Sequence, residues 1–116
     1  MEEITWFDNT AKTKLLMRAR TDTLDLNWRS KFKNLDTKCM CGCVCETLEH
    51  FILHCELYKE VRMRYEILQQ PYIENECEIM SDVLGFRTSD RKAINIRKDL
   101  ISELWKTRKI KIQSCQ

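Results

Sequence analysis

The densest group of candidate metal ligands in the sequence lies in residues 38–55, KCMCGCVCETLEHFILHC. This stretch holds five cysteines and two histidines, and the whole chain has seven cysteines. An odd number of cysteines cannot all pair within one chain, and thiols at this density in a reducing compartment indicate metal binding more often than disulfides. The stretch therefore predicts a metal site, and the fold has to bring four of its side chains together.

The first half of the cluster favours a zinc knuckle. A structural zinc site takes four cysteine or histidine ligands in a tetrahedron, commonly two from a tight turn and two from a helix. Gly42 directly follows Cys41. A glycine at this position lets the backbone turn around the ion and point N–H groups at the thiolates. Cys39 and Cys41 are therefore the expected knuckle pair.

The other two ligands must come from His50, His54 and Cys55. The stretch around them is expected to be helical, with Thr47 as its N-cap. His50 and His54 have the ideal helical spacing of four residues. His50 and Cys55 are five residues apart, a difference that a loosened last turn can absorb. Spacing alone leaves both pairs open. The apolar residues of this helix that are expected to face the core are Leu48, Phe51 and Ile52.

The composition favours an all-α fold. The 116 residues include only two glycines and one proline, so tight turns are few, and the 43% apolar content suffices for one modest core. We expect one small helical domain over residues 1–116, with a zinc knuckle joining its helices. Its parts are a basic helical segment (12–38), the zinc knuckle and helix (39–55), and a helical tail (56–116).

Two helices are expected before the cluster. The first begins at Thr10 as its N-cap, with Ala11, Leu15 and Ala19 along one stripe. The second is expected over residues 22–32, where apolar residues again recur every three or four positions.

Three helical stretches are expected after the cluster, over residues 56–70, 80–84 and 90–110. Only residues 109–113, KIKIQ, alternate in the manner of a strand. The expected boundary residues of these helices are Pro71, Gly85 and either Ser89 or Asp90.

Charge is unevenly distributed along the chain, although the net charge is only +2. Residues 12–38 carry +5 and residues 86–116 carry +6, while residues 39–85 carry −6 and residues 1–11 carry −3. Basic segments of this kind can bind phosphate, or their Lys and Arg side chains can simply solvate helix surfaces.

Taken together, these motifs resemble the C-terminal zinc-binding tail of reverse transcriptases from non-LTR retrotransposons. In that family an Arg-Thr-Gly segment precedes a C-x(1,2)-C-G knuckle, followed by an E-T-x-E-H-x(4)-C helix and a Tyr…Arg continuation. The resemblance is strong over residues 12–65 and loose beyond them. Arg20-Thr21-Asp22 stands where the family usually has Arg-Thr-Gly. The other matching residues are Cys39, Cys41-Gly42, Glu46-Thr47, Glu49-His50, Cys55, Tyr58 and Arg62.

The resemblance implies Zn²⁺ as the cofactor. Cys43 and Cys45 lie where the family is usually polar. They could exchange with Cys39 or Cys41 as ligands or bind a second, weaker ion, and we favour the interpretation that they are spare thiols. His54 is then a partly exposed or second-shell histidine. The ligands that the resemblance implies are Cys39, Cys41, His50 and Cys55.

The resemblance also implies a nucleic-acid-binding module that contacts RNA or DNA. No two aspartates are adjacent, so the paired-aspartate motif of the polymerase is absent from this chain, and we expect neither catalysis nor a small-molecule substrate. The expected phosphate contacts are Arg18, Arg20, Arg29, Lys31, Lys33 and Lys38, followed by Arg97, Lys106, Arg108 and Lys109.

The alternative is a protein-interaction module whose zinc is purely structural. Its apolar stripes would dock on a reverse transcriptase domain or on a second copy of the chain. Neither interpretation involves a membrane. The segment MEEITWFDNT lacks the order of a secretory signal, and no apolar run approaches the roughly 20 residues of a membrane span, so we expect an intracellular protein of the nucleus or cytoplasm.

Overall fold

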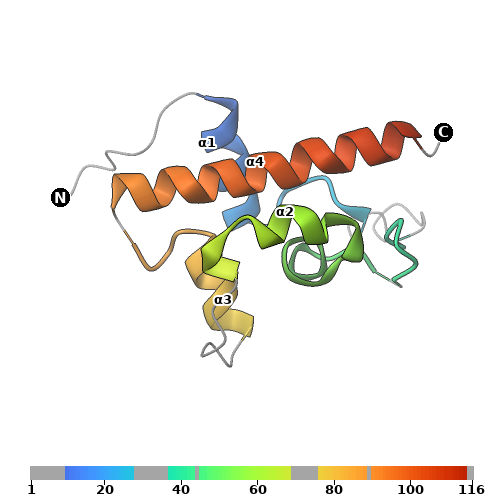
Figure 1. Cartoon of the computed structure of the whole chain (residues 1–116), viewed down its shortest axis with the longest axis horizontal. Coiled ribbons are helices and arrows are strands. Elements are labelled where there is room, and N and C mark those ends of the chain that lie inside the picture. The colour runs from blue at the N-terminus through green and yellow to red at the C-terminus, as the bar shows by residue number, and fades with distance from the viewer. Residues whose placement is uncertain (1–9, 28–36, 44, 69–75, 89, 115–116) are drawn as a thin grey trace.

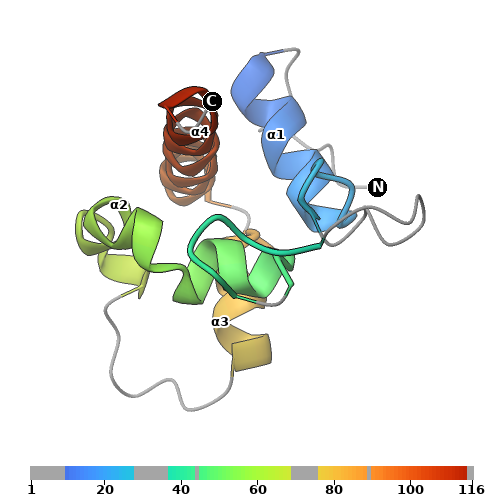
Figure 2. The ribbon, with the colours of Figure 1, turned by 90° about the vertical axis from the view of Figure 1, so that its right-hand side faces the viewer.

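The chain folds into helices joined by a cysteine-rich loop. The computed structural model describes residues 10–27, 37–43, 45–68, 76–88 and 90–114. These residues contain helices and no strand, which confirms the all-α prediction. The helix α4 runs the length of the molecule, with α1 packed beside it (Figures 1 and 2). The shorter helices α2 and α3 lie on the other side of the core (Figure 2).

The first helix, α1, spans Ala11–Arg20. Its N-cap is Thr10, as predicted, because the backbone N–H of Thr13 donates a hydrogen bond to Thr10 Oγ1 at 3.3 Å. The expected stripe is only partly correct, since Ala11 is exposed and Leu15 is half-buried. The face that packs against the core is offset by one residue and consists of Thr13, Leu16 and Ala19.

A Schellman motif ends α1. The N–H of Thr23 donates to the carbonyl of Arg18 at 2.8 Å, and the N–H of Asp22 donates to the carbonyl of Ala19 at 3.1 Å. Asp22 has a φ of +54°, the left-handed conformation that this motif requires. A helix cannot continue through such a residue.

The helix expected from residue 22 is therefore wrong over residues 22–26, which are not helical. Leu24 and Leu26 are both buried although they are two residues apart. In an α-helix, residues two apart point to nearly opposite sides, so the burial of both leucines fits a non-helical segment. Residues 28–32 of the expected helix lie outside the described residues.

The remaining helices are short except for the last. A π-helix at His50–His54 and a 3₁₀ turn at Glu56–Tyr58 lead into α2, Lys59–Met63, which is followed by a second 3₁₀ turn at Glu66–Leu68. Then come α3, Glu76–Val83, and α4, Arg91–Ser114.

The single helix expected over residues 56–70 is thus broken into shorter pieces. Arg64 Nη1 and Tyr65 Oη both bond to the carboxylate of Glu103 on α4, at 2.9 and 2.8 Å. Side chains of consecutive residues diverge by about 100° in a continuous α-helix. The tighter turn here, in which the N–H of Tyr65 bonds to the carbonyl of Arg62 at 3.1 Å, lets both reach one carboxylate. Pro71 lies outside the described residues.

A second Schellman motif ends α3, which is longer than predicted. The N–H of Gly85 donates to the carbonyl of Asp82 at 3.0 Å, and the N–H of Phe86 donates to that of Ser81 at 2.9 Å. Gly85 has a φ of +81°, and a Cβ on it would lie 2.8 Å from Ile94 Cδ1. The prediction of a left-handed cap at this glycine is confirmed.

The last helix is capped by Asp90, whose Oδ2 accepts a 3.4 Å hydrogen bond from the N–H of Ala93. Ser89, the other expected cap, lies outside the described residues. The alternating residues 109–113 belong to α4 rather than to a strand. Among the described helices, none combines the length and the apolar character needed to cross a bilayer. The fully buried side chains of α4 are Ile94, Leu100, Ile101 and Leu104.

Candidate metal centre

The knuckle is a tight turn over residues 39–43. The N–H of Gly42 donates to the carbonyl of Cys39 at 3.0 Å, and the N–H of Cys39 donates to the carbonyl of Cys43 at 3.0 Å. Gly42 has a φ of +99°, which is the reason for a glycine at this position. Burial raises the pKa of the Cys39 thiol, and the backbone N–H of Cys41 lowers that pKa to a smaller extent.

The facing helix is loosened at its end. Thr47 Oγ1 accepts a 3.2 Å hydrogen bond from the N–H of His50, which confirms Thr47 as the cap. The N–H of Cys55 donates to the carbonyl of His50 at 2.7 Å, five residues back. This π-helical spacing is what places His50 and Cys55 on the same side. His54 is exposed, and its Nε2 lies 2.6 Å from Oε1 of Glu76 on α3.

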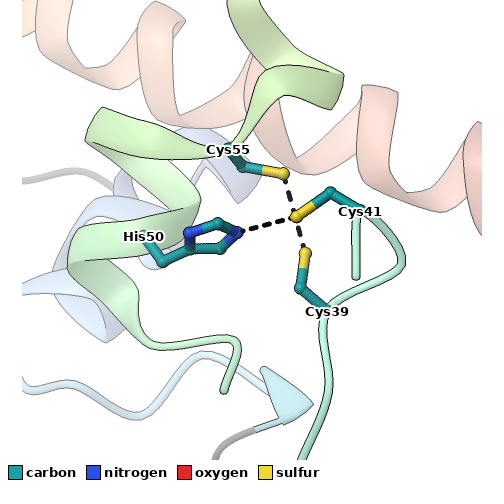
Figure 3. A group of neighbouring side chains, drawn as sticks. All are labelled: Cys39, Cys41, His50 and Cys55. Atoms are coloured by element: carbon teal, nitrogen blue, oxygen red, sulfur yellow. Dashed lines mark hydrogen bonds between the residues drawn. The ribbon is translucent and has the colours of Figure 1, made fainter. Parts of the chain in front are cut away.

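The structure brings together the four residues predicted as ligands (Figure 3). The ligand atoms of these residues all lie within 4.8 Å of one another: Cys39, Cys41, His50 and Cys55.

The distances between these atoms fit a single ion. The sulfurs of Cys39 and Cys55 are 3.6 Å apart, and the sulfur of Cys41 lies 3.2 Å from Nε2 of His50. A tetrahedral site with Zn–S bonds of about 2.3 Å and a Zn–N bond of about 2.0 Å has edges of roughly 3.8 and 3.5 Å. The four side chains can therefore hold a metal with little rearrangement.

Burial controls the protonation of the ligands. It raises the pKa of Cys39 and of Cys55, and it lowers the pKa of His50. A neutral imidazole keeps a lone pair for a metal, whereas a thiol must lose its proton to bind one. The polypeptide thus favours the ligand form of the histidine, and only a cation would favour the thiolate form of the two buried cysteines.

The other cysteines of the described residues lie outside this group. Cys43 and Cys77 are exposed, and Cys45 is partly exposed. None of the cysteines that the structure describes forms a disulfide. The turn directs the side chains of Cys39 and Cys41, but not those of Cys43 and Cys45, to the facing helix.

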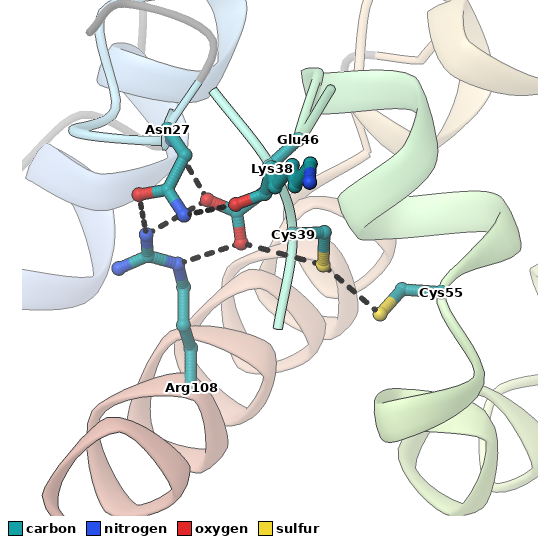
Figure 4. A network of polar contacts seen from close by, with 6 residues as sticks. All are labelled: Asn27, Lys38, Cys39, Glu46, Cys55 and Arg108. Carbon is teal, nitrogen blue, oxygen red and sulfur yellow. Dashed lines mark hydrogen bonds and ion pairs between the residues drawn. The ribbon is translucent and has the colours of Figure 1, made fainter. Parts of the chain in front are cut away.

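A buried ion pair adjoins the metal centre (Figure 4). Arg108 on α4 donates through Nε to Oε2 of Glu46 at 3.0 Å and through Nη2 to Oε1 at 2.8 Å. The N–H of Asn27 also donates to Oε1, at 2.7 Å, while its side chain donates to the carbonyl of Lys38 at 2.6 Å. The carboxylate lies 3.9 Å from the sulfur of Cys39. This network connects Asn27, in the segment that follows α1, to the knuckle and to α4.

Sequence reasoning did not identify this network as part of the site. Glu46 is matched by the family resemblance, but only the ligands were assigned a role. Its carboxylate is 1% exposed, so it requires a partner. The only signal in the sequence is that Glu46, an acidic residue, directly precedes the helix cap Thr47. Nothing in the sequence indicates that Arg108 is the partner of Glu46.

Two further residues matched by the resemblance, Tyr58 and Arg62, pack next to the segment that carries the ligands. Arg62 donates through Nη2 to the carbonyl of Cys55. The buried ring of Tyr58 meets Phe51 edge-on with 5.1 Å between centroids, and Phe51 meets Trp105 of α4 at 6.2 Å. The helix that carries His50 is therefore anchored to α4 by aromatic contacts.

The expected phosphate contacts fall into three groups: residues that are exposed, residues that lie outside the described ranges, and residues whose charged groups bond inside the protein. Arg18 and Lys38 are exposed, as are Lys106 and Lys109 in α4. The three that lie outside the described residues are Arg29, Lys31 and Lys33.

Three expected contacts use their guanidinium groups inside the protein. Arg20 donates to the carbonyls of Leu84 and Gly85 at 2.6 and 2.8 Å. Arg97 is 5% exposed and pairs with Asp82, and Arg108 is 6% exposed and pairs with Glu46. A guanidinium held in this way is not available to a phosphate.

Neither a scan against protein-family models nor searches of curated proteins and of solved structures found a match to this chain. The resemblance to the retrotransposon enzymes rests on the motif residues alone, and it remains a prediction.

Proposed function

We propose that the chain is a non-catalytic zinc module that binds nucleic acid, related to the C-terminal tails of non-LTR retrotransposon reverse transcriptases. The observation that carries the proposal is the convergence of four ligand atoms within 4.8 Å, three of them thiol sulfurs. Thiolate and imidazole ligands select zinc over magnesium or calcium.

The ligand set supports a structural role for the metal. Catalytic zinc sites have three protein ligands and an open position for water or substrate, whereas structural sites have four protein ligands. Here Cys39, Cys41, His50 and Cys55 fill the tetrahedron. The ion would hold the knuckle against the helix from Leu48 to His54 and so keep the core closed.

The charge distribution supports nucleic acid as the partner. Residues 12–38 lead directly into the knuckle with a net charge of +5, so the metal would fix the position of that segment. Arg18 and Lys38 are the predicted contacts from this segment that the structure describes as exposed.

Two measurements on the purified chain test the proposal. Native mass spectrometry should show one zinc per chain. Titration with labelled RNA and DNA at 50 and 200 mM salt should show binding that weakens steeply at the higher salt, because each neutralised phosphate releases a counterion. Absence of metal, or of any salt-dependent binding, would contradict the corresponding half of the proposal.

The alternative, a protein-interaction module, has one observation in its favour. Ile96 and Ile110 on α4 are 47% and 63% exposed. Their separation of fourteen residues returns them to nearly the same side of the helix. A dimer that depends on concentration and not on salt would favour this alternative.

A further inference from the structure

One cysteine of the metal centre is open to solvent. Cys39 and Cys55 are buried and His50 is partly exposed, whereas Cys41 is exposed. The sulfur of Cys41 nevertheless lies in the same group of ligand atoms as the two buried sulfurs (Figure 3). Cys41 is therefore the cysteine through which a reagent in solution reaches the centre.

The three sulfurs of the centre lie close enough to react with one another. Those of Cys39 and Cys55 are 3.6 Å apart, and both lie within 4.8 Å of the sulfur of Cys41. A disulfide bond is about 2.05 Å long, so rotation of the side chains can bring two of these sulfurs to bonding distance. None of the three forms a disulfide in this structure.

Metal binding prepares Cys41 for oxidation. A cysteine that binds zinc has lost its proton, and the thiolate is the form of cysteine that oxidants attack. Cys43 is also exposed and Cys45 is partly exposed, but both lie outside the ligand group, so no metal there removes their protons. Among the described cysteines, exposure and metal ligation therefore coincide at Cys41 alone.

We propose that Cys41 is an oxidation site through which a hydroperoxide releases the metal. The inference rests on the zinc-binding half of the proposed function and adds regulation to that centre. The Cys41 thiolate attacks one oxygen of hydrogen peroxide, the O–O bond breaks, hydroxide leaves, and Cys41 becomes a sulfenic acid. The thiolate of Cys39 or Cys55 then attacks the sulfur of this sulfenic acid, forms a disulfide and expels a second hydroxide. Two thiolates are oxidised by two electrons, and one peroxide is reduced to two hydroxides.

Disulfide formation removes two of the four ligands. One thiolate and His50 remain, whereas a structural zinc site needs four protein ligands. Without the ion, nothing ties the knuckle to the helix from Leu48 to His54. Thiols of a reducing compartment reduce the disulfide and restore the ligands, as for other transient, redox-sensing disulfides. The centre would thus respond reversibly to peroxide.

The first experiment uses the zinc-loaded parent chain. Hydrogen peroxide is added while a chromophoric indicator records the release of zinc, and dimedone in a parallel sample traps the sulfenic acid. Peptide mass spectrometry then identifies the labelled cysteine and, in the sample without dimedone, the disulfide. The label should be on Cys41, the disulfide should join Cys41 to Cys39 or Cys55, and one zinc should leave per disulfide. A dithiol should restore zinc binding.

Two variants separate Cys41 from the other exposed thiols. Cys41→His keeps four zinc ligands, because an imidazole nitrogen replaces the sulfur, and it removes the exposed thiolate. This variant should release zinc at least about tenfold more slowly than the parent, since its remaining ligand sulfurs are buried. The double change Cys43→Ser and Cys45→Ser is the control, and it should release zinc as fast as the parent.

The results that would overturn the inference are distinguishable from failure of the proposed function. If the parent binds zinc but peroxide leaves it in place, or first labels a cysteine outside the ligand group, the inference fails and the zinc module stands. Equal release rates for the parent and Cys41→His would also overturn it. Should Cys41→His bind no zinc, the labelling of the parent decides. If the parent binds no zinc, the metal half of the proposed function fails together with the inference.

Discussion

Arg108 of α4 and Glu46, the residue directly before the helix cap Thr47, form a bidentate ion pair across 62 positions of the sequence, at 2.8 and 3.0 Å. Both side chains are less than a tenth exposed. A zinc ion with three thiolates and a neutral histidine would carry a net charge of −1, and Glu46 adds a second negative charge beside Cys39. Arg108 offsets this charge, so the packing of α4 against the core and the binding of zinc should depend on each other.

Arg108→Gln should lower the free energy of unfolding by about 3–5 kcal/mol, because it leaves the buried Glu46 carboxylate without its cation. It should also weaken zinc binding by about tenfold or more, as the loss of an outer-shell partner does in other sites. Urea unfolding and competition with a chromophoric chelator measure the two effects.

Arg97 provides the matched control for Arg108. It lies about three turns earlier on the same helix, is buried to a similar extent, and pairs with Asp82 of α3 at 2.6 Å rather than with Glu46. Arg97→Gln should destabilise the protein without changing zinc affinity in the folded state. Equal losses of zinc affinity in the two variants would disprove the specific link through Glu46.

Cys41→Ser should abolish tight zinc binding, whereas the double change Cys43→Ser and Cys45→Ser should leave one zinc per chain. The reason is that the knuckle turn presents only Cys39 and Cys41 to His50 and Cys55. Native mass spectrometry gives the stoichiometry. Loss of metal in the double variant would show that the ligand set is wrong.

Zinc affinity should fall as the pH is lowered. Burial raises the pKa of Cys39 and of Cys55, so both thiols hold their protons at neutral pH until a cation displaces them. Each displaced proton makes affinity change about tenfold per pH unit. The protons of these two buried thiols alone predict a loss of at least about a hundredfold between pH 7.5 and 6.5, measured by chelator competition; a flat profile would contradict it.

Asp22→Gly should stabilise the protein relative to Asp22→Ala by about 1–2 kcal/mol. Both changes remove the carboxylate, but alanine suffers the steric cost of a Cβ at a φ of +54° and glycine does not. Thermal unfolding compares the two. Equal stability would mean that the Schellman motif at the end of α1 is not formed.

Arg20→Gln should destabilise the fold by about 2 kcal/mol, because two charge-assisted hydrogen bonds to the carbonyls of Leu84 and Gly85 are lost. Arg18→Gln, two residues earlier on an exposed position, is the control and should change stability little. If the two variants unfold alike, Arg20 has no structural role.

Much of the local structure was determined by the sequence itself. Thr10, Thr47 and Asp90 cap helices as their residue types predict, and Gly42 and Gly85 each adopt a positive φ, which glycine suits. Helical spacing alone did not decide whether Cys55 or His54 is the fourth ligand, because Cys55 requires a loosened last turn. The family resemblance favoured Cys55, and the π-helix at His50–His54 is the loosened turn that this ligand requires.

Tertiary structure decided the ends of helices and the partners of buried charges. Residues 22–26 carry a helical pattern, yet Asp22 turns the chain so that Leu24 and Leu26 both reach the core. Whether an arginine faces solvent, as Arg18 does, or a buried carboxylate, as Arg108 does, depends on which helix packs against it. Residue type and spacing encode caps, turns and ligands because these interactions are local. The pairing of Arg108 with Glu46 depends on packing between distant segments, and only the assembled fold determines it.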